Sequence, residues 1–159
     1  HAFGACINIY DPFAANQENF PENYNFFDDL DTAIKNSEII SLHAPGIGKP
    51  IIGVSEIKLM QDNTILINTS RGSHIDMSAL LDALNSKKIR GAGLDVYPEE
   101  PPSISAHKIF SHKNVLFSPH IAGLNNECAE RMAINSSQNI IDYFDGRLDP
   151  EFVVNKEIL

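Results

Sequence analysis

The sequence predicts an α/β fold built on a doubly wound parallel sheet. Short apolar runs rich in β-branched residues alternate along the chain with segments of helical spacing, which is the pattern of strand–helix–strand units. Each apolar run stops at a polar or proline-bearing turn, as expected of buried strands whose ends reach the surface. No internal repeat or low-complexity linker divides the chain.

The expected elements follow one another in a regular order. Strands are expected at residues 3–11, 37–45, 63–72, 89–98 and 114–120, and helices at residues 28–36, 54–60, 75–88 and 125–144. Asp76 is well placed to cap the third helix, because its carboxylate can accept hydrogen bonds from the first free backbone N–H groups. Gly146 marks the end of the last helix.

Composition restricts the partners of the chain. The 159 residues are 43% hydrophobic and 21% charged, which suits one globular domain with a substantial core. The formal net charge is −9 and no run is rich in Lys or Arg, so neither a nucleic acid nor an anionic membrane is expected as a partner. Cys6 and Cys128 form no CxxC motif, and no apolar stretch reaches about 18 residues. We therefore expect a cytoplasmic protein in a reducing environment.

Charged or titratable side chains follow nearly every expected strand. Parallel strands present their carboxyl ends at one edge of a sheet, where ligands bind in such folds. In chain order the residues at that edge are Asp11, His43, Arg71, Asp95 followed by Glu100, and His120. Taken singly, each has an ordinary structural explanation, such as a turn opener or a hydrogen-bonded loop histidine. Together they indicate a functional site. No metal is expected in it, because His107, His112 and His120 lack acidic or cysteine partners at ligand spacing.

Two segments carry a specific resemblance: INTSRGSHIDMSALLDALNSKKIRGAGLDVYPEEPP at residues 67–102 and NVLFSPHIAG at residues 114–123. They are similar to the NAD-binding domain of the D-isomer-specific 2-hydroxyacid dehydrogenase family, in its phosphoglycerate dehydrogenase and glyoxylate/hydroxypyruvate reductase branch. The similarity extends over residues 3–155. It implies a Rossmann-like fold, NAD as the cofactor, a homodimer, and an oxidoreductase that acts on a small 2-keto or D-2-hydroxy acid.

The resemblance also implies roles for individual residues. Arg71, Glu100 and His120 would form the catalytic trio. The residues implied in cofactor binding are Asp11 at the adenosine ribose, Asp95 at the nicotinamide carboxamide, and His43, Ala44, Pro45, Thr69, Ser70 and Gly123 along the cofactor. The loop at residues 46–50 departs from the family pattern.

The reduction of a 2-keto acid explains these residue types. A hydride must reach the carbonyl carbon, a proton must reach its oxygen, and a cation must hold the carboxylate. The guanidinium of Arg71 suits the carboxylate, because its fork of donors matches two oxygens and keeps its charge. His120 suits proton transfer near neutral pH, with Glu100 fixing its tautomer. A carboxylate at Asp11 would accept from a ribose 2′-hydroxyl and repel a 2′-phosphate, so NAD is expected in preference to NADP.

The resemblance also sets the expected domain organisation. Relatives carry a GxGxxG pyrophosphate loop upstream, and no such fingerprint occurs in these residues. Residues 1–159 are therefore expected to form most of a single dinucleotide-binding domain that lacks its first strand and Gly-rich loop, without a substrate domain. The absent strand is expected between the strands at residues 5–10 and 64–68. The chain by itself is expected to bind NAD weakly or not at all and to have no dehydrogenase activity. Two alternatives are an NAD-sensing corepressor or scaffold of the same fold and an inactive truncated product.

Overall fold

The computed structural model describes residues 4–13, 24–105 and 107–158. The chain divides into two compact units, residues 1–120 and residues 121–159. The first unit contains the strands and the shorter helices, and the second contains one long helix followed by short 3₁₀ turns.

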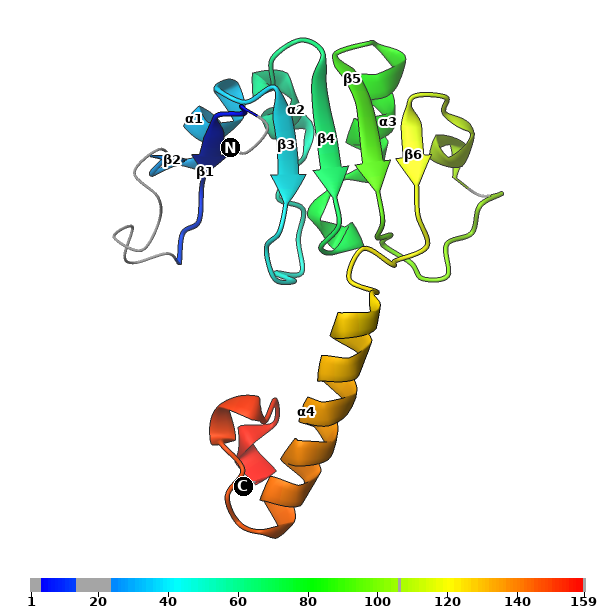
Figure 1. Cartoon of the computed structure of the whole chain (residues 1–159). Coiled ribbons are helices and arrows are strands. Elements are labelled where there is room, and N and C mark those ends of the chain that lie inside the picture. The colour runs from blue at the N-terminus through cyan, green and yellow to red at the C-terminus, as the bar shows by residue number, and fades with distance from the viewer. Residues whose placement is uncertain (1–3, 14–23, 106, 159) are drawn as a thin grey trace. The chain divides into compact units, whose positions relative to one another are not determined.

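A four-stranded parallel sheet forms the centre of the first unit. Its strands, in spatial order, are β3 (Ile39–Leu42), β4 (Thr64–Asn68), β5 (Ile89–Leu94) and β6 (Val115–Phe117). Neighbouring strands pair in parallel throughout, so all four carboxyl ends lie at the same edge, where the arrowheads lie in Figure 1. The α/β class and the parallel sheet predicted from the sequence are therefore confirmed.

Helices precede and connect these strands. α1 (Leu30–Lys35) precedes β3, and the connections contain α2 (Val54–Leu59) and α3 (Met77–Asn85), with the 3₁₀ turns η2 (Gly72–His74) and η3 (Lys108–Ser111). Asp76 caps α3 as predicted, because its carboxylate accepts from the backbone N–H groups of Ser78 at 2.9 Å and Ala79 at 3.1 Å. Asp29 caps α1 in the same way, and the hydrogen bond from the Thr32 backbone lowers the pKa of Asp29.

The core lies between the sheet and the helices α2 and α3, which cover one face of the sheet (Figure 1). Side chains of the strands alternate accordingly, so that Thr64, Leu66 and Asn68 of β4 are buried while Ile65 and Ile67 are only half-buried. On the opposite face, Leu116 of β6 is mostly exposed. Leu80 of α3 is fully buried in the core.

A separate two-stranded parallel sheet pairs β1 (Ile7–Ile9) with β2 (Tyr24–Phe26). β2 was not predicted from the sequence, because three residues are too short to display an alternating pattern. The side-chain amide of Asn8 connects β1 to the start of β3, since it donates to the Asn36 carbonyl oxygen at 2.8 Å and to the Ser37 hydroxyl oxygen at 3.1 Å.

The position predicted for the absent strand, next to the strand at residues 64–68, is wrong. An absent strand was placed between the strands at residues 5–10 and 64–68, but β4 is hydrogen-bonded to β3 on one side and to β5 on the other. Within the described residues, β3 and not β4 is the edge strand of the four-stranded sheet. The error follows from the missed β2, because leaving one strand out of the count shifts the position of every later strand in the order.

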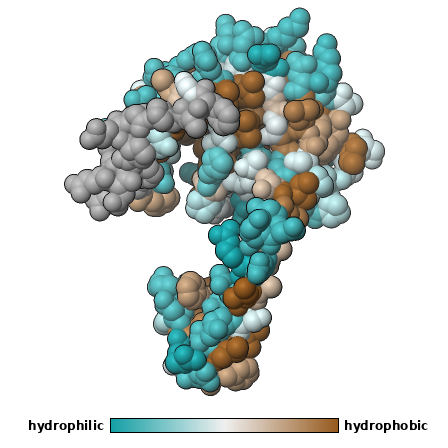
Figure 2. Space-filling view, viewed as in Figure 1, coloured by the Kyte–Doolittle hydropathy of each residue, from teal (hydrophilic) through white to brown (hydrophobic). Residues whose placement is uncertain are grey.

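The second unit contains α4 (Asn126–Phe144), followed by η4 (Pro150–Phe152) and η5 (Lys156–Ile158). Asn125 caps α4 by accepting from the Cys128 backbone N–H at 2.7 Å, and Gly146 follows its end with a φ of 68°, as predicted. None of the residues in α4 is buried, and Figure 2 shows apolar side chains on its surface among polar ones. No helix in the described residues is both long and apolar enough to cross a membrane.

The burial of Leu80 predicts a large effect on stability. Leu80→Ala should lower the free energy of unfolding by about 2–5 kcal/mol, because it removes buried methyl groups and leaves a cavity. Leu116→Ala is the matched control, and since its side chain is 80% exposed the change should stay within about 0.5 kcal/mol. Urea unfolding followed by circular dichroism measures both, and equal losses for the two variants would contradict the assigned core.

Candidate active site

The predicted site residues of the first unit lie at the carboxyl ends of its strands. His43 follows β3, Arg71 follows β4, Asp95 follows β5 and His120 follows β6, while Asp11 lies just beyond β1. Because β3 to β6 run parallel, their ends share one edge of the sheet (Figure 1).

Glu100 and His120 form a hydrogen-bonded pair at this edge. The distance between Nδ1 of His120 and Oε2 of Glu100 is 2.7 Å. The other carboxylate oxygen, Oε1, accepts from the Tyr97 backbone N–H at 2.9 Å. That backbone hydrogen bond, followed by the one with His120, lowers the pKa of Glu100, so the group is a carboxylate at neutral pH. A carboxylate can only accept, so Nδ1 of His120 carries a proton and Nε2 is the nitrogen that remains for proton transfer.

The backbone of His120 has an uncommon conformation. Its φ is 56°, in the left-handed region that residues with a Cβ seldom adopt. The turn at residues 118–120 uses this conformation to leave β6 and place the ring against Glu100. Such backbone strain is concentrated at functional sites in proteins, which favours a functional role for this histidine.

Arg71 shares one cavity with this pair. The cavity has a volume of about 260 Å³, and its lining consists of Arg71, Gly72, Ser73, Val96, Tyr97, Pro98, Glu100 and His120. Nη1 of Arg71 donates to the Ser70 carbonyl oxygen at 2.7 Å, which fixes one edge of the exposed guanidinium. The cavity therefore contains a permanent cation, an imidazole and the carboxylate that orients it.

Gly72 allows the loop after β4 to meet the loop after β5. A Cβ at this position would lie 1.9 Å from the Tyr97 carbonyl carbon and 2.4 Å from the Pro98 nitrogen, so no side chain fits. Both of these contacts are with backbone, which cannot move aside as a flexible side chain can. This close approach brings Arg71 next to the segment that carries Glu100, and the sequence analysis assigned Gly72 no role.

Tyr97 and Ser118 fasten the ends of β5 and β6 to each other. The Tyr97 hydroxyl donates to the Ser118 carbonyl oxygen at 2.7 Å, and the Ser118 hydroxyl donates to Oδ1 of Asp95. Burial, reinforced by the charge of Asp95, raises the pKa of Tyr97, so the phenol keeps its proton and its role as donor. The sequence analysis missed Tyr97, whose only local signal is its place between the strand end and the Pro-rich turn.

The residues predicted to bind the cofactor have different surroundings. Exposed side chains among them are Asp11, His43, Pro45 and Thr69; Ala44 is half-buried; Ser70 and Asp95 are buried; and Gly123 belongs to the second unit. Oδ1 of Asp11 accepts from the Phe13 backbone N–H at 2.8 Å, and Nε2 of His43 lies 2.9 Å from the Ser41 hydroxyl oxygen. This set of carboxylate, hydroxyl and imidazole groups can hydrogen-bond to the ribose and amide groups of a dinucleotide.

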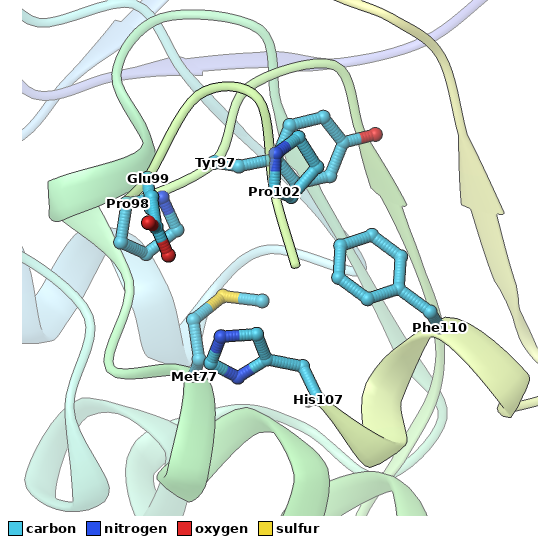
Figure 3. A pocket seen from close by; sticks show the side chains of 7 residues that line it. All are labelled: Met77, Tyr97, Pro98, Glu99, Pro102, His107 and Phe110. Atoms are coloured by element: carbon cyan, nitrogen blue, oxygen red, sulfur yellow. The ribbon is translucent and has the colours of Figure 1, made fainter. Parts of the chain in front are cut away.

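No group of three or more His, Cys, Asp or Glu side chains that could hold a metal ion occurs in residues 4–13, 24–105 and 107–158. A second cavity, also of about 260 Å³, lies near the first and shares Tyr97 and Pro98 with it. Figure 3 shows the side chains that line this cavity, which are Met77, Tyr97, Pro98, Glu99, Pro102, His107 and Phe110. It lacks Arg71, Glu100 and His120, so the three residues predicted to be catalytic line only the first cavity.

The sequence matches known proteins. Residues 1–122 match the model of a protein family described as D-isomer specific 2-hydroxyacid dehydrogenase, NAD binding domain. The chain is 44% identical over 133 residues to a glyoxylate reductase of Thermococcus litoralis, covering 82% of this chain and 39% of the relative. It is 38% identical over 121 residues to D-3-phosphoglycerate dehydrogenase of Escherichia coli, covering 73% of this chain and 30% of the relative.

The fold is also similar to that of solved dehydrogenase structures. A D-lactate dehydrogenase with NAD+ from Lactobacillus jensenii superimposes with a TM-score of 0.82 at 30% identity, over 97% of this chain and 49% of that one. The chain thus spans less than half the length of these relatives.

The close approach at Gly72 predicts that adding a single methyl group there destabilises the fold. Gly72→Ala should lower the free energy of unfolding by roughly 1–3 kcal/mol, because the loops after β4 and β5 must separate to admit the Cβ. Gly93→Ala in β5 is the control, since a Cβ there would lie 4.0 Å from the Ile67 side chain, an ordinary contact. Denaturant unfolding of both variants tests this, and a neutral Gly72→Ala would show that the loops are not in contact.

Proposed function

Because this chain belongs to the D-isomer specific 2-hydroxyacid dehydrogenase family, as its NAD-binding domain, we propose that it supplies the catalytic residues of an NAD-dependent dehydrogenase. The proposed reaction interconverts a small 2-keto acid and the corresponding D-2-hydroxy acid. The observation that carries the proposal is the hydrogen-bonded Glu100–His120 pair in one cavity with Arg71. A homodimer and a cytoplasmic location are part of the same proposal.

His120 would act as the proton donor during reduction. Its Nδ1 is occupied by Glu100, so Nε2 would give its proton to the keto oxygen as that oxygen gains negative charge. Glu100 would stabilise the imidazolium before the transfer and hold the ring in one orientation throughout. In the opposite direction, Nε2 of the neutral ring would accept the proton of the 2-hydroxyl group.

Arg71 would hold the substrate carboxylate. A guanidinium can donate two parallel hydrogen bonds to the two carboxylate oxygens, which fixes the position of the adjacent keto carbon. The hydrogen bond from its Nη1 to the Ser70 carbonyl limits the motion of the side chain and leaves other N–H groups for the substrate. Substrate positioning of this kind lowers the entropic part of the barrier.

The reduced cofactor, NADH, would supply the hydride that reaches the keto carbon. Asp11, exposed beyond the end of β1, would accept hydrogen bonds from the adenosine ribose and disfavour a 2′-phosphate. His43, Ala44, Pro45, Thr69, Ser70, Asp95 and Gly123 are the other residues proposed to line the cofactor. The buried Asp95 already accepts from the Ser118 hydroxyl, so it would also support the end of β6.

A turnover assay on the full-length protein tests this proposal. NADH oxidation is followed by absorbance with glyoxylate, hydroxypyruvate and 3-phosphohydroxypyruvate as separate substrates. Turnover with at least one of them is expected. Tight NADH binding without turnover of any keto acid would instead support an NAD-sensing corepressor, and loss of both would support an inactive product.

Replacement of His120 tests the proton donor. In the full-length protein His120→Asn should lower kcat by roughly 10²–10⁴, the usual effect of a positioned general acid, with NADH binding retained. His107→Asn is the matched control, because His107 lines the second cavity and not the first. Steady-state kinetics and calorimetric titration with NADH measure these effects. Near-normal turnover of His120→Asn would remove the residue from the mechanism.

Replacement of Arg71 tests the carboxylate contact. Arg71→Lys keeps the charge but loses the planar fork, so kcat/KM for keto acids should fall by at least about tenfold while the affinity for NADH is largely preserved. Arg90→Lys, at an exposed position of β5, controls for the general effect of the substitution. A loss of NADH affinity as large as the loss of kcat/KM would contradict a contact with the substrate.

A further inference from the structure

His74 is a fully buried histidine whose ring connects two loops of the site. Its exposed fraction is 0%, and it is the last residue of η2. Nδ1 lies 2.9 Å from the Ser70 hydroxyl oxygen, and Nε2 lies 3.0 Å from the Pro45 carbonyl oxygen. The ring therefore lies between the segment at residues 43–45 and the segment at residues 69–71.

The backbone of His74 holds the other end of the same loop. Its carbonyl oxygen accepts from the Ile51 N–H at 2.8 Å and from the Ile52 N–H at 2.9 Å. The loop at residues 46–50, which is exposed along its whole length, is thus fastened at both ends to one residue. The side chain of His74 fastens the end at Pro45, and its main chain fastens the end at Ile51.

The hydrogen bonds of the His74 ring continue through Ser70 to Asn68. The Pro45 carbonyl can only accept, so Nε2 of His74 carries a proton. Asn68 donates from its Nδ2 to the Arg71 carbonyl oxygen at 2.8 Å, and its Oδ1 accepts from the Ser70 backbone N–H at 3.1 Å. The Ser70 hydroxyl also donates to Oδ1 of Asn68 at 3.0 Å, and its oxygen lies 2.9 Å from Nδ1 of His74. Each polar side-chain atom of Asn68, Ser70 and His74 thus has a hydrogen-bond partner.

We propose that His74 is a positioning residue that holds the loop at residues 43–50 in register with the segment that carries Arg71. This proposal rests on the proposed function, in which both segments contact the cofactor or the substrate. The network joins the Arg71 backbone, through Asn68, Ser70 and His74, to the Pro45 carbonyl. Loss of the imidazole bond would leave the loop attached to His74 only through the bonds from the Ile51 and Ile52 amides, which would then open more often.

Three substitutions of His74 distinguish the loss of its ring hydrogen bonds from a general loss of stability. His74→Leu fills the buried volume but removes both ring hydrogen bonds. His74→Gln keeps a donor at about the reach of Nε2, so it can still bond to the Pro45 carbonyl. His74→Asn places its amide near the position of Nδ1, next to Ser70, and is too short to reach Pro45. Thr64→Val is the control, because it removes a buried hydrogen bond to the Gln61 carbonyl at the amino end of β4, away from the loop.

The test is hydrogen–deuterium exchange of the Ile51 and Ile52 amides, which donate to the His74 carbonyl oxygen at the end of the loop, in the full-length protein without ligands. Exchange should be on the order of tenfold faster in His74→Leu and His74→Asn, the factor expected for the loss of one hydrogen bond, and close to wild type in His74→Gln and Thr64→Val. The KM for NADH should rise in the same two variants with a smaller change in kcat.

Unchanged loop exchange in His74→Leu, or equal exchange in the Asn and Gln variants, would overturn the proposal. If His74→Leu does not fold, the comparison of Asn with Gln still decides it. The exchange measurement needs no turnover, so it gives its result even if the full-length protein proves not to be a dehydrogenase. A KM that changes equally in Thr64→Val would likewise count against a specific role for His74.

Discussion

The contact between Gly72 and the backbone of Tyr97 and Pro98 is the constraint on which the site depends. The strands of the parallel sheet bring their carboxyl ends to one edge, but a shared edge alone leaves the loops free to diverge. Because Gly72 has no Cβ, the loop after β4 can lie directly against the loop after β5. Arg71 and Glu100, which belong to different loops, consequently line one cavity.

The remaining polar contacts preserve this arrangement. The backbone N–H of Tyr97 donates to the Glu100 carboxylate, and its hydroxyl donates to the Ser118 carbonyl oxygen. A single residue thus connects the carboxylate to the turn that carries His120. The left-handed backbone of His120 costs on the order of 1–3 kcal/mol, and the surrounding bonds must hold it in place. The geometry of the candidate site therefore depends on three loops that are hydrogen-bonded or packed against one another, and not on any one of them.

Local patterns in the sequence predicted much of the fold. Asp76 was identified as a cap and α4 as a long helix because capping and helical periodicity depend on neighbours a few residues away. The three-residue strand β2 gave no such signal, and its omission misplaced the neighbour of β1. Gly72 and His74 could not be assigned from the sequence, because their partners, Tyr97 and Pro45, are brought to them only by the folded chain.

The net negative charge of the chain disfavours an anionic ligand, whereas Arg71 in the cavity favours one. Which of the two effects is larger depends on the distance between the charges. A formal net charge of −9 would repel a small acid at long range, but at physiological ionic strength charges more than about 8 Å apart are largely screened. A carboxylate about 4 Å from a guanidinium gains roughly 4 kcal/mol at an effective dielectric constant of about 20. Glu100 opposes this attraction less when its partner His120 is protonated, because the pair is then neutral as a whole. The form of His120 that can donate a proton is thus also the form in which the cavity is most attractive to an anionic keto acid.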